Sequence, residues 1–408
     1  MNVLIITPYL PYPLNNGGLI RVHHLVINIA SVHNVTLLCM EPDNDEQAAG
    51  VAVLESHGVT VELVPVATNQ KKNAKRLYQL LSIFTGKTYQ YYQYHSDAMQ
   101  HNIDSICETN SFDLILAEFS QMGYYEFPEN ITRYVDQHNV EYEIMQRTFE
   151  TERSPLRKLL AKSEWRKYHQ HEIENCEKFD TCLTTSQRDT DILSSRLSSG
   201  TRFHVIPNGV DSDFFQPAAQ PVNPDLILFT GTISYYPNVE GILWFTKNVW
   251  PLIKQKRPSA QFCIAGKSPP AEIQALANDT AIEVTGSVDD MREYYAKASV
   301  VVVPLRVGGG TRLKILEAMA MGKAIVSTAV GAEGIDYTEG KDIVIEDEPE
   351  SFADSTIRVM DSQDIRVNLE SQGRILVEQL YDWKAVTGRL CDIFEEDSRQ
   401  KSEIRKAS

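Results

Sequence analysis

The sequence predicts an α/β protein made of two successive doubly wound domains with a cleft between them. Three observations support this prediction. The chain has 408 residues, more than a single hydrophobic core usually organises. Short apolar runs alternate with stretches of helical length from end to end. One stretch rich in proline, asparagine and aspartate, from 207 to 225, interrupts this alternation, which then begins again.

Each half contains five expected strands. In the first half they are residues 3–7, 35–40, 59–66, 113–119 and 132–139. In the second half they are residues 226–231, 261–266, 282–286, 300–305 and 324–328. Several of these runs are apolar at consecutive positions, which is typical of parallel strands covered by helices on both faces. Ligands commonly bind between two such domains.

Composition narrows the function classes. A formal net charge of −16 excludes general nucleic-acid binding, which needs a basic surface. The six cysteines form no C-x-x-C pair and are expected to be reduced thiols. The amino terminus begins with an apolar run that is expected to be a strand, and no apolar run approaches the length of a membrane span. We therefore expect a cytoplasmic protein.

A triple-glycine loop in the second half is the most informative feature. Gly308, Gly309 and Gly310 follow the apolar strand 300–305, and a helix is expected to begin near Thr311. Glycines let the backbone come close to a ligand, and the N–H groups at a helix start favour a phosphate. The loop matches neither the Walker A pattern nor G-x-G-x-x-G.

Charged residues follow this loop in the expected helix. Arg312 and Lys314 bring positive charge to a helix start, where it is unfavourable unless an anion such as a diphosphate is bound. Glu317 comes about one and a half turns into the helix and could accept hydrogen bonds from two ribose hydroxyls. The alternative is a glycine turn that enters an amphipathic helix, with both cations solvated.

At these residues the chain resembles the retaining "group 1" glycosyltransferases of the GT-B architecture, which has two facing Rossmann-like domains. LKILEAMAMGKAIVST is similar to the signature helix and strand of that family, and VIPNGVDSDFFQP to its interdomain segment. The resemblance extends over essentially the whole chain. It implies an acceptor-side domain (1–210), a linker (211–225) and a domain binding the nucleotide-sugar donor (226–377). It also implies helices at about 378–395 that pack back on the first domain, followed by a charged tail (396–408) that we expect to be disordered.

Two positions depart from the family pattern. Gly309 stands where the first glutamate of Glu-x7-Glu is expected, and Asn238 follows Gly231 where arginine and lysine are usual. A subgroup with GGGTRLKILEAMA is similar, and there Arg312 and Lys314 could supply the displaced charge. The resemblance implies the following donor-binding residues: Gly17, Gly18, Gly231, Asn238, Gly286, Val288, Gly308, Gly309, Gly310, Thr311, Arg312, Lys314 and Glu317.

The first half contains further candidate residues. Gly17 and Gly18 lie between the first strand and a helix expected to begin near Leu19, although an ordinary turn explains them nearly as well. His138 lies at the carboxyl end of a strand, where doubly wound sheets place functional groups. It is similar in position to the family histidine that reaches the reacting sugar, with a structural histidine as the alternative. Glu141 is a weaker candidate for contacting acceptor or sugar.

The resemblance implies retaining transfer of a sugar from a nucleotide diphosphate to a glycan, lipid-linked or other acceptor, in polysaccharide or glycoconjugate synthesis. His138, Arg312 and Lys314 are the expected catalytic residues, and no metal or other cofactor is expected. Two alternatives remain: a non-catalytic nucleotide-sugar-binding protein, suggested by Gly309, and a sugar-nucleotide epimerase.

Two basic segments in the first half suggest peripheral contact with the inner face of a membrane, where a lipid-linked acceptor could lie. A solvated helix face is the alternative. The basic residues are Lys71, Lys72, Lys75 and Arg76 in the first segment, and Arg153, Arg157, Lys158, Lys162, Arg166 and Lys167 in the second.

Overall fold

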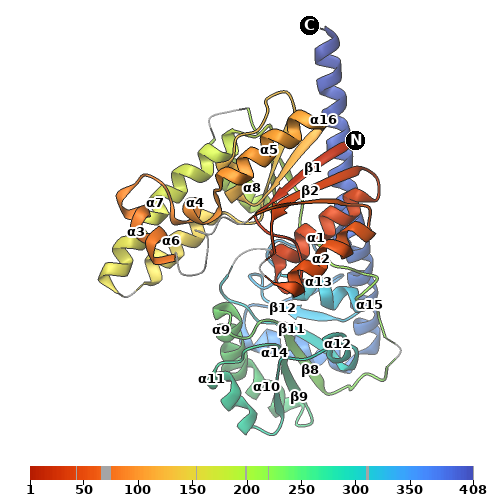
Figure 1. Ribbon diagram of the computed structural model, residues 1–408. Helices are drawn as coiled ribbons and strands as arrows, with labels where there is room; N and C mark the ends of the chain where they lie inside the picture. Colours follow the sequence, from red (N-terminus) through yellow and green to blue (C-terminus); the bar gives the residue numbers. More distant parts are fainter. Residues whose placement is uncertain are drawn as a thin grey trace. The chain divides into compact units, whose positions relative to one another are not determined.

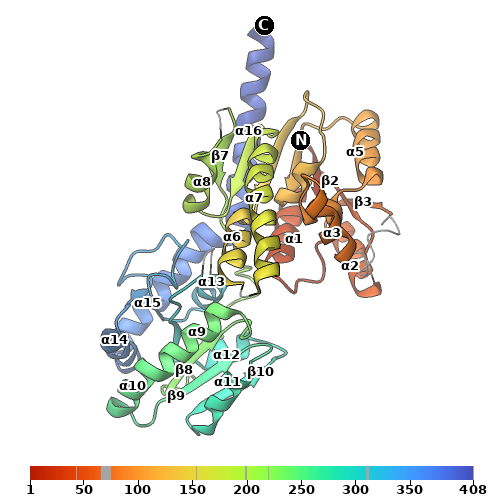
Figure 2. The ribbon, with the colours of Figure 1, turned by 90° about the vertical axis from the view of Figure 1, so that its left-hand side faces the viewer.

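The computed structural model describes residues 1–42, 44–65, 75–152, 154–197, 200–218, 220–308 and 312–407. The chain forms two compact units, each built on one parallel sheet (Figures 1 and 2). The first unit consists of Met1–Ile206 and Thr387–Ser408, and the second of Pro207–Val386. The chain therefore leaves the first unit once and returns to it near its end.

The sheet of the first unit has the order β3-β2-β1-β4-β5-β6-β7. Its strands are β1 (Asn2–Thr7), β2 (Asn34–Met40), β3 (Thr60–Val64), β4 (Leu114–Glu118), β5 (Thr132–Gln137), β6 (Thr181–Thr184) and β7 (Arg202–Val205). The strand order changes direction between β1 and β4. At such a switch point the loops after the two strands separate and leave room for a ligand.

Helices connect these strands and cover the sheet (Figure 1). They are α1 (Gly17–Ala30), α2 (Asp45–Ser56), α3 (Lys75–Phe84), α4 (Tyr89–Tyr94), α5 (Asp97–Thr109), the 3₁₀ helix η3 (Ser120–Tyr124), α6 (Glu141–Thr151), α7 (Pro155–Glu177) and α8 (Gln187–Ser194). All five residues of β4 are buried, as expected for a strand covered on both faces.

The second sheet has the order β10-β9-β8-β11-β12-β13 and changes direction between β8 and β11. Its strands are β8 (Leu226–Thr230), β9 (Gln261–Ala265), β10 (Ile282–Gly286), β11 (Val300–Val303), β12 (Ile325–Ser327) and β13 (Val344–Ile345). The four valines of β11 are fully buried at the centre of this sheet. The second switch point therefore lies where β8 and β11 end.

Further helices complete the second unit. They are α9 (Tyr236–Trp244), the π-helical η4 (Phe245–Val249), α10 (Trp250–Lys256), α11 (Ala271–Gln274), the 3₁₀ helix η5 (Ala275–Asn278), α12 (Arg292–Lys297), α13 (Leu313–Ala320), α14 (Pro349–Asp361), α15 (Gln363–Leu376) and the π-helical η6 (Val377–Tyr381). The last helix, α16 (Trp383–Ala407), carries the chain back to the first unit.

The prediction of two doubly wound α/β domains is confirmed. The expectation of a disordered tail is wrong, because α16 continues to Ala407. Asp397, buried in this helix, accepts hydrogen bonds from Tyr134 of β5 and Arg202 of β7, which order the helix against the first sheet. In the part of the chain that the structure describes, no helix is both long enough and apolar enough to span a bilayer.

Candidate functional site

Three adjacent strands of the second sheet end in glycine. Gly231 follows β8, Gly266 follows β9, and Gly286 is the last residue of β10. All three have positive φ. The N–H of Gly266 donates to the carbonyl of Gly286, 3.1 Å away. A Cβ on Gly266 would lie 1.7 Å from the carbonyl oxygen of Gly231, so no side chain fits there. The carboxyl edge of the sheet is therefore bare backbone, which a ligand can approach closely.

Lys314 extends its ammonium group to this bare edge. The helix α13 begins at Leu313, so Lys314 lies in its first turn, and Arg312 precedes the helix as its N-cap. Nζ of Lys314 donates to Oδ1 of Asn238 over 2.8 Å. A Cβ on Gly231 would lie 3.0 Å from the same nitrogen. Asn238 is itself fixed by donating from Nδ2 to the carbonyl of Thr232, 2.7 Å away.

The surroundings of Lys314 favour the loss of its proton. Burial and the nearby Arg312 lower the pKa of Lys314 to about 7, although the carboxylate of Glu317 opposes this shift. An anion bound beside the ammonium would restore its charge. Binding of an anion here would therefore be accompanied by uptake of a proton.

Glu317 is held one turn further along α13. The hydroxyl of Tyr295 donates to its Oε2 over 3.0 Å and lies 2.8 Å from the hydroxyl of Thr230. Burial raises the pKa of Glu317. Its Oε1 accepts no hydrogen bond from the described residues and is the atom that a ligand hydroxyl could reach.

The other predicted donor-binding residues of the second unit that the structure describes lie after β10 and β11, whereas Gly17 and Gly18 belong to the first unit. Gly308 has a φ of +118°, and a Cβ there would lie 2.9 Å from Nη2 of Arg312, so Gly308 lies close to this side chain. Val288 is partly exposed in the loop after β10. Gly309, Gly310 and Thr311 lie outside the described residues. The helix begins later than predicted, which makes Arg312 a cap and not a first-turn residue.

A hollow of about 470 Å³ opens beside Gly308. Arg306 and Val307 line it together with residues of the loop after β12, between Ala329 and Tyr337. Sequence reasoning did not include this loop, although it follows the expected strand 324–328. The hollow gives a bound molecule room next to the glycine loop.

The first unit contains a buried ionic cluster at its own switch point. Arg21 of α1 donates to both oxygens of Asp136, from Nε over 2.7 Å and from Nη2 over 2.9 Å. Nε2 of His138 lies 2.9 Å from Glu118 Oε2 and 3.4 Å from Asp136 Oδ2. The structure therefore brings together one predicted residue, His138, with three that sequence reasoning missed as a site.

Charges within this cluster determine its protonation. Burial and the neighbouring Asp136 raise the pKa of Glu118 to about 7. Burial opposes ionisation of Asp136, but Arg21 and His138 outweigh it and hold the pKa of that carboxyl below its usual range. Burial likewise opposes protonation of His138, yet the two carboxylates raise its pKa. The two carboxylates therefore favour the protonated form of His138.

The ring of His138 is fixed in position. Phe119 has a φ of +74°, and its ring centroid lies 3.9 Å from that of His138. A Cβ on Gly18 would lie 3.2 Å from the Phe119 ring, which gives Gly18 a packing role. The helix α1 begins at Gly17, two residues earlier than expected, and Asn16 caps it. Nδ1 of His138 is buried without a hydrogen-bond partner in the described structure.

Ligand atoms of Glu118, Asp136 and His138 lie within 4.8 Å of one another, a geometry that a metal ion could use. Both oxygens of Asp136 are already hydrogen-bonded to Arg21, so a cation would have to displace a guanidinium. Oε1 of Glu118 is buried without a partner in the described structure. The donor set fits a shared proton better than a metal ion.

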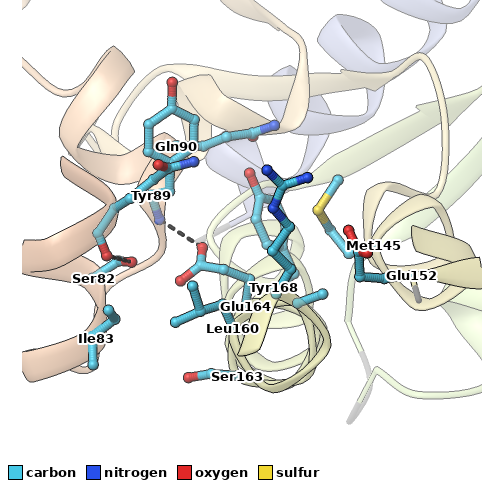
Figure 3. Close-up of a pocket in the computed structure, with 13 residues that line it drawn as sticks. Ser82, Ile83, Tyr89, Gln90, Met145, Glu152, Leu160, Ser163, Glu164 and Tyr168 are labelled. Carbon is cyan, nitrogen blue, oxygen red and sulfur yellow. Dashed lines mark hydrogen bonds between the residues drawn. The ribbon is translucent and has the colours of Figure 1, made fainter. Parts of the chain in front are cut away.

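A larger hollow of about 650 Å³ lies between helices of the first unit (Figure 3). Ser82 and Ile83 of α3 and Tyr89 and Gln90 of α4 line one side, facing Leu160, Glu164 and Tyr168 of α7. Glu164 Oε2 accepts a hydrogen bond from the N–H of Tyr89 over 2.8 Å. Arg157 of the second basic segment also lines this hollow, whereas Lys71, Lys72 and Arg153 are outside the described residues.

The sequence was compared with protein families and with known proteins. Residues 224–362 match the family described as "Glycosyl transferases group 1". An uncharacterised 44.6 kDa protein in the cps region of Klebsiella pneumoniae is 24% identical over 168 residues. That alignment covers 39% of this chain and only 43% of the Klebsiella protein.

Two solved structures resemble the whole chain. Sucrose-phosphate synthase from Thermosynechococcus elongatus has a TM-score of 0.66 at 16% identity, covering 97% of this chain and 98% of the other. Anabaena HepE, solved in complex with UDP, has a TM-score of 0.66 at 13% identity, covering 97% of this chain and 100% of the other. The chain has the GT-B fold, and its second unit contains the segment that matches the group 1 glycosyl transferases.

Proposed function

We propose that the protein is a retaining glycosyltransferase that moves a sugar from a nucleotide diphosphate to an acceptor. The observation that carries this proposal is the pairing of Lys314 with Asn238 beside the bare backbone of Gly231. A cation, a helix start and side-chain-free strand ends together suit a diphosphate. Glu317, held by Tyr295, would accept the ribose hydroxyls. The UDP bound in HepE supports a nucleotide diphosphate as the donor's leaving group.

In this proposal catalysis depends on positively charged side chains that are already in position before the reaction. As the bond between sugar and diphosphate breaks, negative charge grows on the departing oxygen, and Lys314 and Arg312 stabilise it. The acceptor attacks from the face that the diphosphate leaves, and a phosphate oxygen takes the acceptor's proton. No protein nucleophile is needed. In this proposal His138 contacts the transferred sugar through Nδ1, which has no hydrogen-bond partner in the described structure.

We propose, first, that this activity serves the synthesis of a polysaccharide or glycoconjugate. We propose, second, that it requires no metal ion. The cps-region relative supports the first part. The cations Arg312 and Lys314 support the second, because they supply the charge that a metal would otherwise provide. All six cysteines are free thiols, which supports a reducing compartment such as the cytoplasm.

A nucleotide panel tests the proposal. UDP-, GDP-, ADP- and dTDP-sugars are added to the protein, and its melting temperature is measured, since a ligand that binds only the folded state raises it. At least one is expected to raise the melting temperature, and Glu317→Ala to weaken that response at least tenfold. No response to any nucleotide would overturn the proposal. Activity that survives dialysis against EDTA supports metal independence, and loss of activity would contradict it.

A second candidate function is non-catalytic binding of a nucleotide sugar, which Gly309 favours because the usual carboxylate is missing there. Turnover separates the two functions. A transferase releases the nucleotide diphosphate from its preferred sugar donor. The release is slow when water accepts the sugar and faster when a glycan extract supplies the acceptor. A binder shows the thermal response without any release.

We further propose that the first unit contacts a membrane surface through α3 and α7. Phe84 is 79% exposed at the end of α3, Leu77 is 54% exposed in the same helix, and Leu159 of α7 is 65% exposed. Basic residues Arg157 and Arg166 are exposed on α7, in a protein whose net charge is negative. Exposed large apolar side chains next to basic ones suit the headgroup region of an anionic bilayer.

A further inference from the structure

The hydroxyl of Tyr295 links three elements of the second unit. It donates to Oε2 of Glu317 in α13 over 3.0 Å and lies 2.8 Å from the hydroxyl of Thr230, the last residue of β8. The carbonyl oxygen of Lys314 lies 3.3 Å away and is the weaker of the possible acceptors. Because Thr230 has a proton of its own to donate to the phenol oxygen, the phenol proton is directed to the carboxylate of Glu317.

Tyr295 can act on a ligand only through Glu317. The side chain of Tyr295 has no exposed surface, whereas that of Glu317 is partly exposed. The two oxygens of Glu317 have different surroundings, because Oε2 accepts the hydrogen bond from Tyr295 and Oε1 accepts none from the described residues. The bond at Oε2 restrains rotation of the carboxylate, so Oε1 keeps its direction before a ligand binds. A group that is already fixed loses less entropy on binding.

The short helix that carries Tyr295 is itself anchored to the end of α13. Lys323, which follows α13, is buried, and its Nζ donates to the carbonyls of Ala296 and Ala298 over 3.0 and 3.2 Å. Both carbonyls lie at the carboxyl end of α12, where a cation satisfies groups that have no partner within the helix. The phenol and the carboxylate are therefore held together by their own bond and by the elements that carry them.

The phenol and the carboxylate also have the protonation states that this bond needs. Burial and the charge of Glu317 raise the pKa of Tyr295 well above its usual value, so the phenol keeps its proton. Burial raises the pKa of Glu317, while the hydrogen bond from Tyr295 and the charge of Lys314 oppose that rise. The hydroxyl of Tyr295 thus favours the ionised form of Glu317, which accepts hydrogen bonds at both oxygens.

We propose that Tyr295 is a positioning residue that makes the donor site select ribonucleotides over 2′-deoxyribonucleotides. The inference rests on the proposed transferase function and deepens it by naming the sugar of the donor's nucleotide. Tyr295 holds Oε2 of Glu317 and thereby directs Oε1 at the ribose hydroxyls. A 2′-deoxynucleotide offers one hydroxyl fewer and leaves part of the carboxylate without a partner once the ligand has excluded water. A site built to bind a hydroxyl discriminates strongly against a ligand that lacks it.

Calorimetric titration measures this selection. The probes are UDP, GDP and ADP, the 2′-deoxy form of each, and inorganic pyrophosphate, which has no ribose. The unaltered protein is expected to bind its preferred nucleoside diphosphate about tenfold or more tightly than the 2′-deoxy form, as the loss of one hydrogen bond to a charged group predicts.

Tyr295→Phe removes only the hydroxyl and tests its role. We expect this variant to bind the preferred ribonucleotide about tenfold more weakly and to lose most of the preference over the 2′-deoxy form. Pyrophosphate should bind as it does to the unaltered protein, because it offers Glu317 no ribose hydroxyl. Tyr294→Phe removes the hydroxyl of the neighbouring, partly exposed tyrosine of α12 and is the matched control, which should behave like the unaltered protein.

Two further variants test whether the effect passes through Glu317. In a Glu317→Ala background, Tyr295→Phe is expected to cause no additional loss, because the two residues act as one unit. Thr230→Val keeps the phenol but removes the group that directs its proton to Glu317. It is expected to lower the preference for the ribonucleotide about twofold or more, and it replaces Tyr295→Phe if that variant does not fold.

The inference and the transferase proposal fail in different ways. Equal binding of the ribo and 2′-deoxy forms by the unaltered protein overturns the inference, and so does an unchanged preference in Tyr295→Phe. A Tyr295→Phe variant that binds pyrophosphate and both nucleotides more weakly by the same factor also overturns it, because that pattern reports a general structural role. A protein that binds no nucleotide contradicts the transferase proposal itself, whereas nucleotide binding without selection leaves that proposal standing.

Discussion

Lys314 combines two contacts that come from distant parts of the second unit. Its ammonium bonds Asn238 of α9, and it lies 4.0 Å from the ring centroid of Phe229 in β8. In this environment the proton on Lys314 is weakly held in the unliganded protein, as its pKa of about 7 indicates. A bound diphosphate would raise that pKa again, because opposite charge favours the protonated form.

The affinity for UDP is therefore expected to fall as the pH rises from 7 to 9. The bound state needs the protonated lysine, whereas the unliganded state loses that proton above about pH 7. Between the two pKa values the loss approaches about tenfold per pH unit. Calorimetry at pH 7, 8 and 9, in buffers of different ionisation enthalpy, measures the affinity and the proton uptake.

Lys314→Met should bind UDP weakly and with little dependence on pH over this range. Lys341→Met, which removes an exposed lysine of the same unit, is the matched control and should behave like the unaltered protein. An unaltered protein whose affinity is constant from pH 7 to 9 would contradict the role given to Lys314.

The protonation of Glu118 is expected to make the stability of the folded protein depend on pH. Its pKa in the folded protein is about 7, above the ordinary value of 4.5, so the folded state binds a proton more tightly than the unfolded state. The stability contributed by that proton is complete below pH 4.5 and is lost as the pH rises through 7. The raised pKa of His138 acts in the same direction at higher pH.

We expect the melting temperature of the first unit to fall between pH 5 and pH 8, and Glu118→Gln to flatten that fall. Glutamine keeps the shape and a hydrogen bond to His138 but does not titrate. Scanning calorimetry across this range measures the slope. Parallel slopes for the two proteins would show that Glu118 is not the titrating group.

The sequence identified Lys314, Glu317 and His138 because each lies within a recognisable segment. It did not identify Tyr295, which comes from α12 and meets Glu317 only across the fold. Glu118 and Arg21 were missed for the same reason, since Glu118 of β4 meets His138 after β5, and Arg21 of α1 meets Asp136 of β5, only in the folded unit. A residue whose partner is distant in the chain gives no local pattern.

At the scale of elements, β8, β9 and β10 share an ending that the sequence shows three times, as FTG, IAG and VTG. Gly231 and Gly286 were predicted to bind the donor, but Gly266 was not, although its environment is the most restrictive of the three. The strands β6, β7 and β13 were not predicted at all. They have four, four and two residues, and β7 is only partly buried, so their apolar patterns are weak.

Gly266→Ala is expected to disrupt the donor edge. The added Cβ would meet the Gly231 carbonyl oxygen at 1.7 Å, with φ at +150°, so the ends of β8 and β9 must separate. We expect a loss of unfolding free energy of about 2 kcal/mol or more and loss of the thermal response to UDP. Denaturant unfolding and the nucleotide panel measure the two effects.

Gly286→Ala is the matched comparison at the neighbouring strand. A Cβ there meets nothing within 4 Å, and only its φ of +70° is unfavourable. The cost should be about 1 kcal/mol, with UDP binding retained. Equal losses in the two variants would mean that backbone strain, and not contact with Gly231, makes Gly266 necessary.

For the whole molecule, charge and exposed apolar area are unevenly distributed. The chain carries a net charge of −16, yet on α7 of the first unit Arg157, Arg166 and Leu159 are all exposed. The fold class was predictable because the strand–helix alternation runs through the entire chain. The exposure of Phe84 and Leu77 was not, because an apolar residue in an amphipathic helix is ordinarily assigned to the core.

Sedimentation with lipid vesicles tests whether this surface binds a bilayer. We expect binding to vesicles with 30% phosphatidylglycerol, little binding to pure phosphatidylcholine, and weakening by salt, because the attraction to the anionic surface is screened. Phe84→Ser combined with Leu159→Ser removes two exposed apolar side chains and should abolish most of the binding. Val367→Ser, at a residue 49% exposed in α15 of the second unit, is the control and should bind fully. Equal binding by the double variant and the control would exclude α3 and α7 as the contact surface.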